Sequence, residues 1–158
     1  MTITARTLMQ ESIILVAPED PLIGVQRLFA DEMIHGAPVV DEQNRVLGVI
    51  STSDLLQAVT DERDSAYPVP GYFEDGVASF AGFADEDFRE ALGEQRVADV
   101  MTRDIVSVSP GASIGEVART LRHNRMHRVL VIEDDVLVGI ITTFDLIELL
   151  EKDYGGQQ

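Results

Sequence analysis

The sequence has no cysteine, and its 12 Lys and Arg residues stand against 28 Asp and Glu residues. The lack of cysteine excludes disulfides, thiolate zinc sites and cysteine nucleophiles. The formal net charge of −16 argues against a nucleic-acid partner, because such affinity depends on neutralising phosphates with Lys and Arg. The chain also lacks a glycine-rich loop ending in Lys-Ser or Lys-Thr, so it has no P-loop.

Long apolar runs are absent as well. The longest lie at 13–18 and 129–132, far short of the roughly 20 residues that a membrane-spanning helix needs. No basic segment followed by an apolar stretch opens the chain, which disfavours a secretory leader. We therefore expect a cytoplasmic protein without a membrane partner. Its 158 residues suit one compact domain, or two small units that share a core.

The chain contains the same unit twice. Identical residues recur at a constant offset: Met9 and Met101, Ile13 and Ile105, Pro18 and Pro110, His35 and His127, Val39 and Val131. After a one-residue shortening in the second copy, the matches continue: Gly48 and Gly139, Thr52 and Thr143, Asp54 and Asp145. Apolar character is preserved between the identities, which chance would not produce. The sequence is therefore an internal duplication.

Each copy begins with a predicted strand and a helix. The strands are expected at 13–16 and 105–108. The start of the helix is signalled by Asp20-Pro21 in the first copy. In the second copy it is signalled by Ser113 with Glu116, which have the spacing of a capping box.

Each copy continues with a β-hairpin and a closing helix. Two strands flanking a polar turn are expected at 38–50 and 129–141, and the closing helices at 53–59 and 144–151. The unit is thus β-α-β-β-α, and alone it would bury too little apolar surface. We therefore predict an α/β fold in which the two β-α-β-β-α repeats pack about a pseudo-twofold axis.

The segment between the copies is strongly acidic, with ten acidic and two basic residues. This composition predicts either a solvated linker or a docking surface that uses the aromatic residues of the segment. Part of it, 85–92, predicts a short amphipathic helix with Phe88 and Leu92 on one face. The expected domains are repeat 1 at 1–60, the acidic linker at 61–95, and repeat 2 with a short C-terminal tail at 96–158.

The strongest local motif is Ser51-x-x-Asp54, which recurs as Thr142-x-x-Asp145 at the junction of strand and helix. The spacing favours a helix cap, in which hydroxyl and carboxylate serve each other's backbone N–H groups. It also suits binding of a vicinal diol, as an acidic residue binds ribose in dinucleotide folds. Both interpretations can hold, because a capping carboxylate can present its free lone pairs to a ligand.

A second motif is basic and occurs in the second copy alone. We predict a stripe along the first helix of that copy, since steps of three stay near one helix face. Its members are Arg119, Arg122, Arg125 and Arg128, with His123 and His127 beside them. The stripe either neutralises the acidic linker or binds an anion, because arginine forks match phosphate oxygens.

The duplicated unit resembles a tandem pair of CBS domains, the arrangement called a Bateman module. The resemblance covers about residues 1–60 and 96–152 and rests on HGAPVVDEQNRVLGVISTSDLL, VADVMTRDIVSVSP and MHRVLVIEDDVLVGIITTFDLIELL. It implies a regulatory module that binds adenosine ligands in clefts between the repeats. It also implies a homodimer formed through helices.

The resemblance implies roles for both motifs. The ribose would be held by Ser51 with Asp54 and by Thr142 with Asp145. The pair His127-Arg128 is similar to a phosphate-contacting pair in the adenylate-sensing subunit of a metabolic kinase, and Arg125 joins it as a phosphate-binding candidate. The first copy departs from this pattern, with glycine after its histidine.

In such modules the adenine lies against backbone and apolar side chains near the first strand and the hairpin. The residues that the resemblance places there are Ile34, Gly36, Val49, Met126 and Ile140.

No nucleophile–base pair is evident, and three histidines without cysteine make a poor metal set, so we predict no enzymatic activity, catalytic residue, metal or cofactor. We expect a regulatory sensor of AMP, ADP or ATP, or of S-adenosylmethionine, that acts on a regulated protein. The alternative is a constitutive dimerisation or scaffold module with vestigial clefts.

Overall fold

A computed structural model describes residues 2–59 and 86–156 of the chain. The chain divides into two compact units, one formed by Ile14–Ile105 and the other by Met1–Ile13 together with Val106–Gln158. We call them the first-repeat unit and the second-repeat unit. Each contains strands and helices, which confirms the α/β class and the duplication.

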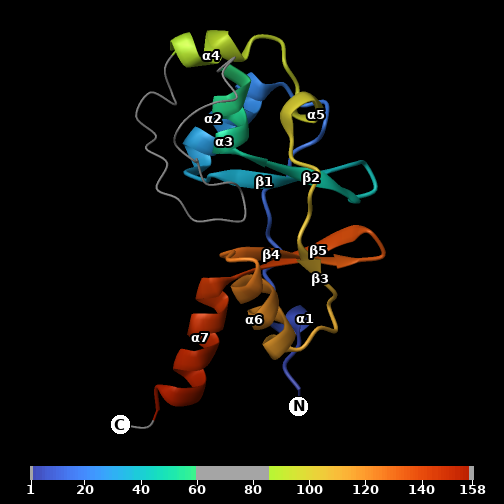
Figure 1. Cartoon of the computed structure of the whole chain (residues 1–158), viewed down its shortest axis with the longest axis vertical. Coiled ribbons are helices and arrows are strands. Elements are labelled where there is room, and N and C mark those ends of the chain that lie inside the picture. The colour runs from blue at the N-terminus through green and yellow to red at the C-terminus, as the bar shows by residue number, and fades with distance from the viewer. Residues whose placement is uncertain (1, 60–85, 157–158) are drawn as a thin grey trace. The chain divides into compact units, whose positions relative to one another are not determined.

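In the first-repeat unit an antiparallel hairpin carries the helices (Figure 1). The pattern predicts this hairpin and both flanking helices correctly. The expected strand at 13–16 is reduced to a single bridge between Val16 and Val39. The elements are α2 (Leu22–Glu32), β1 (Gly36–Val40), β2 (Val46–Ser51), α3 (Thr52–Val59), α4 (Glu86–Leu92) and α5 (Val97–Val100).

The core of the first-repeat unit contains apolar residues from before and after the acidic segment. Phe29 of α2, Ile50 of β2 and Leu55 of α3 are fully buried. Leu92 of α4 and Val97 of α5 are buried with them, so the end of the acidic segment contributes to the core. The short helix expected at 85–92 is confirmed as α4, while the Phe88 side chain and residues 60–85 lie outside the described residues.

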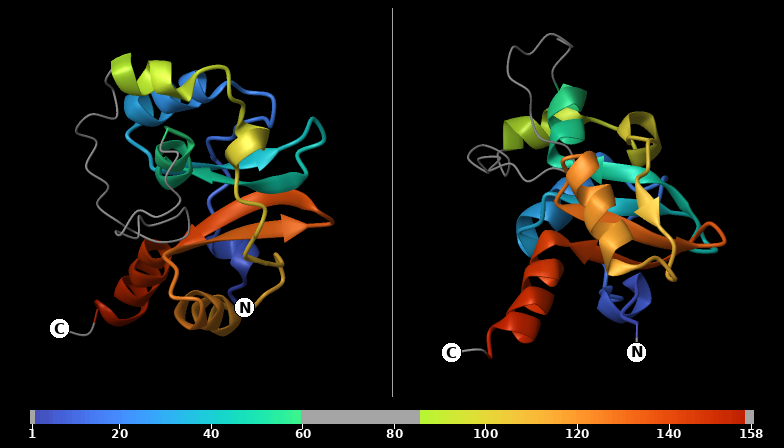
Figure 2. Two further views of the ribbon diagram at one scale, coloured as in Figure 1. Left: turned by 45° about the horizontal axis from the view of Figure 1, so that its top comes forward. Right: turned by 60° about the horizontal axis from the view of Figure 1, so that its bottom comes forward.

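In the second-repeat unit a three-stranded sheet has the order β3-β4-β5, with β3 parallel and β5 antiparallel to β4. Figure 2 shows α7 leaving the end of β5, and α6 lying beside the sheet. The predicted hairpin and helices are present, and α7 is longer than expected. The elements are α1 (Ala5–Leu8), β3 (Ser107–Val108), α6 (Ile114–His123), β4 (Arg128–Glu133), β5 (Val136–Thr142) and α7 (Thr143–Tyr154).

The predicted basic stripe does not follow one helix face. Helix α6 ends at His123, and Arg125 adopts a left-handed conformation with φ 53°. The Met126 N–H then donates to the Leu121 carbonyl at 2.9 Å, a bond that closes helix ends in the Schellman manner. Arg125 therefore lies in the turn and Arg128 begins β4, so the prediction of a continuous helical stripe is wrong.

The segment that precedes each repeat in the sequence pairs with the last strand of a hairpin. Thr102 exchanges two backbone hydrogen bonds with Val49, both 2.9 Å. Gln10 does the same with Ile140, at 2.8 and 3.0 Å. Residues 1–13 thus pack with the second repeat, and 101–105 with the first.

The repeated glycine of the hairpin makes this close pairing possible. A Cβ atom on Gly48 would lie 2.5 Å from the Thr102 carbonyl oxygen, and one on Gly139 would collide with the Met9 side chain. Both distances are too short for real carbon contacts, so an alanine would push the pairing segment away.

We predict that Gly48→Ala lowers the free energy of unfolding by about 1–3 kcal/mol, because its new methyl group meets backbone and not a flexible side chain. Urea unfolding measures the change. Gly111→Ala is the control, since nothing lies within 4 Å of that added methyl group. A Gly48→Ala protein as stable as the control protein would contradict the close-packing argument.

Candidate functional site

In the first-repeat unit, Ser51 and Asp54 join the end of β2 to the first turn of α3. Asp54 Oδ2 accepts hydrogen bonds from the Ser51 backbone N–H at 2.8 Å and from Ser51 Oγ at 3.1 Å. The Asp54 N–H faces Ser51 Oγ in return, at 3.4 Å. The capping interpretation of this motif is therefore confirmed.

The second-repeat unit repeats this arrangement. Asp145 Oδ2 accepts from the Thr142 N–H at 2.7 Å and from Thr142 Oγ1 at 3.2 Å, within a capping box at the start of α7. The Asp145 residue is only 8 % exposed. Two carboxylates are thus fixed in matching positions, one in each unit.

The other oxygen of each carboxylate is met by the segment that precedes the repeat in the sequence. Thr102 Oγ1 donates to Asp54 Oδ1 at 3.1 Å. Gln10 Nε2 donates to Asp145 Oδ1 at 2.8 Å. Our sequence reasoning missed Gln10 and Thr102, although the offset that aligns Met9 with Met101 also aligns these two residues.

Burial changes the acidity of Asp54. Removal of the carboxylate from water raises the pKa of Asp54 above its ordinary value of 3.8. Hydrogen bonds from Ser51 and Thr102 stabilise the ionised form and oppose this rise without cancelling it. Ser51 and Thr102 therefore fix the Asp54 carboxylate in place, while its burial disfavours the ionised form.

The phosphate candidates fall into two places. Arg128 lies directly opposite Thr142 in the β4–β5 register, so the two side chains share a face of the sheet. The equivalent pair in the first-repeat unit is Gly36 opposite Ser51, which offers no cation. Arg125 and His127 instead line a hollow of about 320 Å³ between α6 and α7.

The adenine candidates are largely engaged in packing and backbone pairing within their own units. Val49 is 1 % exposed, and both its backbone groups pair with Thr102. The backbone groups of Ile140 pair with Gln10 in the same way. Met126 is buried and lines the α6–α7 hollow. Ile34 packs against the core of the first-repeat unit, and Gly36 opens β1.

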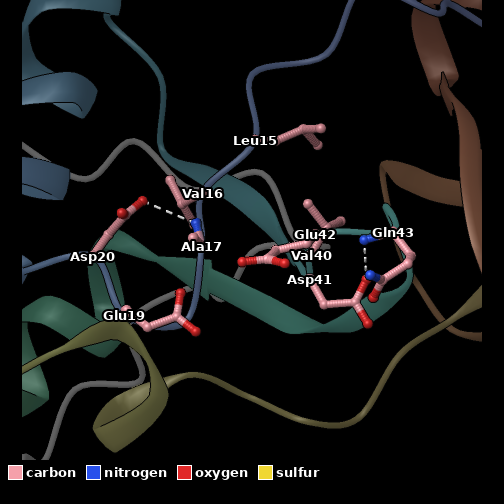
Figure 3. A pocket seen from close by; sticks show the side chains of 9 residues that line it. All are labelled: Leu15, Val16, Ala17, Glu19, Asp20, Val40, Asp41, Glu42 and Gln43. Carbon is pink, nitrogen blue, oxygen red and sulfur yellow. Dashed lines mark hydrogen bonds between the residues drawn. The ribbon is translucent and has the colours of Figure 1, made fainter.

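A larger cavity of about 570 Å³ lies in the first-repeat unit and is lined by acidic residues (Figure 3). Asp20 accepts from the Ala17 N–H at 2.9 Å, and Glu19 and Glu42 extend into the same region. A backbone hydrogen bond from Arg45 lowers the pKa of Asp41, which keeps that carboxylate ionised. Such a lining repels phosphate, so this cavity does not suit a nucleotide.

Across residues 2–59 and 86–156, no group of three or more His, Asp or Glu side chains is arranged to hold a metal ion. No helix in the described part of the chain has both the length and the apolar character needed to cross a bilayer.

We predict that Asp54→Asn changes how stability depends on pH. Because the folded-state pKa of Asp54 is raised, the carboxyl favours folding most below its unfolded-state pKa, and this contribution is lost as pH rises through the folded value. The amide oxygen of asparagine can still accept the hydrogen bonds from Ser51, but the side chain cannot ionise. The stability of the variant relative to the parent should therefore increase from about pH 4 to pH 7.

Urea unfolding at several pH values measures this difference. Asp104→Asn, at an exposed position, is the control for the loss of one charge. A stability difference between Asp54→Asn and parent that stays constant, or falls, as pH rises contradicts the prediction.

Comparisons with known proteins identify the family. The CBS domain model matches residues 5–61 and 97–152. The uncharacterised protein MJ1426 of Methanocaldococcus jannaschii is 34 % identical over 145 residues, covering 87 % of this chain and 85 % of that protein. A Vibrio cholerae protein assigned to acetoin utilization, AcuB, has a similar structure, with a TM-score of 0.71, 25 % identity and complete coverage of both chains.

A further similar structure is the CBS domain pair of protein MJ0100, in complex with 5′-methylthioadenosine and S-adenosyl-L-methionine. It has a TM-score of 0.64, covers 97 % of this chain and 99 % of its own, and at 16 % identity shows the fold alone. The family match spans both repeats, and the duplicated hairpin-and-helix unit is the one that the structure displays. The chain belongs to the CBS-domain family and carries a pair of CBS domains.

Proposed function

We propose that the protein is a regulatory module without enzymatic activity that binds an adenine nucleotide through Asp54 and Asp145. The observation that carries the proposal is the matched pair of capped carboxylates, each fixed by a strand end and a helix start. The hydrogen bonds that the structure describes at each carboxylate come from neutral donors, and a carboxylate oxygen with a free lone pair can also accept from a ribose hydroxyl. The adenosine ligands of the MJ0100 domain pair support the ligand class.

The ligand is proposed to be AMP, ADP or ATP in the first place, with S-adenosylmethionine as the less favoured candidate. The position of Arg128 supports this order, because its guanidinium group shares a sheet face with Thr142 and can meet phosphate oxygens. Arg125 and His127, which line the α6–α7 hollow, are the further phosphate candidates. Met126, beside them, remains an adenine candidate together with Ile34, Gly36, Val49 and Ile140.

The proposed mechanism is a shift between conformations. A nucleotide that binds one conformation more tightly raises the population of that conformation, by at most its difference in binding free energy. A regulated protein would then read the change. No step in this mechanism requires a cofactor or a metal.

We predict that, in a chain carrying Asp54→Asn as the parent so that the second-repeat site dominates, Asp145→Asn weakens AMP and ATP binding by about ten- to a hundredfold, because hydrogen bonds to a charged acceptor contribute about 1.5–3 kcal/mol. Isothermal titration calorimetry measures the affinity, and thermal denaturation shows whether each ligand raises the melting temperature of the parent. Glu148→Gln, an exposed change on the same helix, should bind like the parent. If Asp145→Asn binds both nucleotides as tightly as the parent does, the ribose assignment fails.

The alternative function, a constitutive dimerisation module, is favoured by one observation. Helix α7 exposes four large apolar residues along its length, at fractions of 55–72 %. Their spacing of three or four positions places them along one side of the helix. They are Phe144, Ile147, Leu150 and Tyr154. We propose that a second copy of the chain covers this stripe, under either function.

We predict that Ile147→Asp converts a homodimer to a monomer, because a carboxylate would be buried in an apolar interface without a partner. Sedimentation velocity measures the mass. Asp153→Ala, an exposed change on the same helix, should leave the dimer intact. A parent that is monomeric, or an Ile147→Asp protein that stays dimeric, contradicts this interface. A dimer whose melting temperature responds to none of AMP, ATP and S-adenosylmethionine would favour the scaffold function.

A further inference from the structure

We infer that Gln10 competes with the ribose of a ligand for the carboxylate of Asp145. The second-repeat site then binds a vicinal diol only when the Gln10 side chain withdraws, whereas the matching donor at the first-repeat site is the Thr102 hydroxyl, which only has to rotate. The inference rests on the proposed function and adds to it a residue that makes the two sites unequal. Each carboxylate already accepts hydrogen bonds on both of its oxygens.

An ionised carboxylate has about four acceptor positions, two on each oxygen. The Thr142 N–H and hydroxyl fill both positions on Asp145 Oδ2. The Gln10 amide occupies one of the two positions on Oδ1. One position is left, while a vicinal diol that donates from both hydroxyl groups needs two. A diol that donates both hydroxyl protons to Oδ1 therefore requires that Gln10 release its hydrogen bond, because rotation of the Thr142 hydroxyl frees a position on Oδ2 only.

Asp54 has the same number of hydrogen bonds but a different competing donor. Ser51 fills the positions on Oδ2, and Thr102 donates one hydrogen bond to Oδ1. A hydroxyl group can rotate its proton away and then accept a hydrogen bond itself, which an amide nitrogen cannot do. Binding of a diol to Asp54 Oδ1 thus requires only that the Thr102 hydroxyl rotate its proton away.

The placement of Gln10 allows withdrawal of the side chain alone. Its backbone N–H and carbonyl pair with Ile140, which anchors the residue to β5. The residue is exposed, so the amide can turn into water after it leaves Asp145. The buried carboxylate does not move, since Thr142 and the first turn of α7 hold it. Gln10 is therefore a specificity-determining residue that acts by competition.

The test compares two ligands that differ by one hydroxyl group. AMP carries the vicinal diol, whereas deoxyadenosine monophosphate carries a single ribose hydroxyl, which the free position on Asp145 can accept without displacement of Gln10. Titration calorimetry is done on the full chain with Asp54→Asn, so that the second-repeat site dominates the signal. Gln10→Ala is then introduced, with Gln10→Thr to copy the first repeat and Thr102→Ala as the matched control.

We expect Gln10→Ala to tighten AMP binding by about three- to tenfold, the gain from a typical hydrogen bond that no longer has to be broken. Affinity for deoxyadenosine monophosphate should stay within about twofold, so the preference for AMP should rise. Gln10→Thr should also tighten AMP binding, and Thr102→Ala should leave this site unchanged. Thermal melts check that each variant is folded.

The possible results separate the inference from the proposed function. If the Gln10→Ala protein binds AMP no more tightly than its Asp54→Asn parent, while that parent binds AMP, the competition is overturned and the nucleotide function stands. Weaker binding would make Gln10 a ligand contact, which also overturns it. If the Gln10→Ala protein binds AMP and its Asp54→Asn parent does not, Gln10 blocks the site completely, which supports the inference. If neither protein binds AMP, the proposed function fails and the inference fails with it.

Discussion

The pairing of a short preceding segment with the last strand of each hairpin is the constraint on which the candidate sites depend. Two backbone hydrogen bonds fix Thr102 on β2 and two fix Gln10 on β5. Glycine at 48 and 139 lets these segments approach, since any larger residue would collide with them. The side chains of Thr102 and Gln10 then reach the aspartates that cap α3 and α7. Each capping carboxylate thus receives donors from two parts of its unit, the end of a strand and the preceding segment, which accounts for its fixed position.

The duplication preserved the frame of the site and changed the groups around it. Serine with aspartate and threonine with aspartate make the same hydrogen bonds to the backbone. The residue opposite the hydroxyl is Gly36 in one unit and Arg128 in the other. The second-repeat site therefore combines a cation with an amide donor, while the equivalent positions of the first-repeat site hold Gly36 and the Thr102 hydroxyl. Two sites of one ancestry would then rank ligands differently, by phosphate charge and by the number of ribose hydroxyl groups.

The sequence was sufficient to predict elements that local chemistry decides. The Asp20-Pro21 and Ser113 signals mark the starts of α2 and α6, and both hairpins follow their turns. The sequence was insufficient where the structure depends on contacts with residues far away in the chain or on a local change of backbone conformation. The strand expected at 13–16 survives only as a bridge at Val16, and residues 1–13 pack with the second repeat. The arginine spacing suggested a continuous helix, yet the left-handed turn at Arg125 ends it, and no periodicity count contains that information.

Charge separates the acidic cavity from the candidate nucleotide sites. The cavity of the first-repeat unit gathers Glu19, Asp20, Asp41 and Glu42, and a phosphate there would meet repulsion at short range. At the aspartate motifs, by contrast, one carboxylate stands among neutral donors. A single carboxylate suits a hydroxyl-rich sugar, and the phosphates of the same ligand need a cation some distance away. Arg128 lies on β4, opposite Thr142 of the motif, and provides a cation on the same face of the sheet. The net charge of −16 thus disfavours polyanions over the whole surface while leaving a local place for a small anionic ligand.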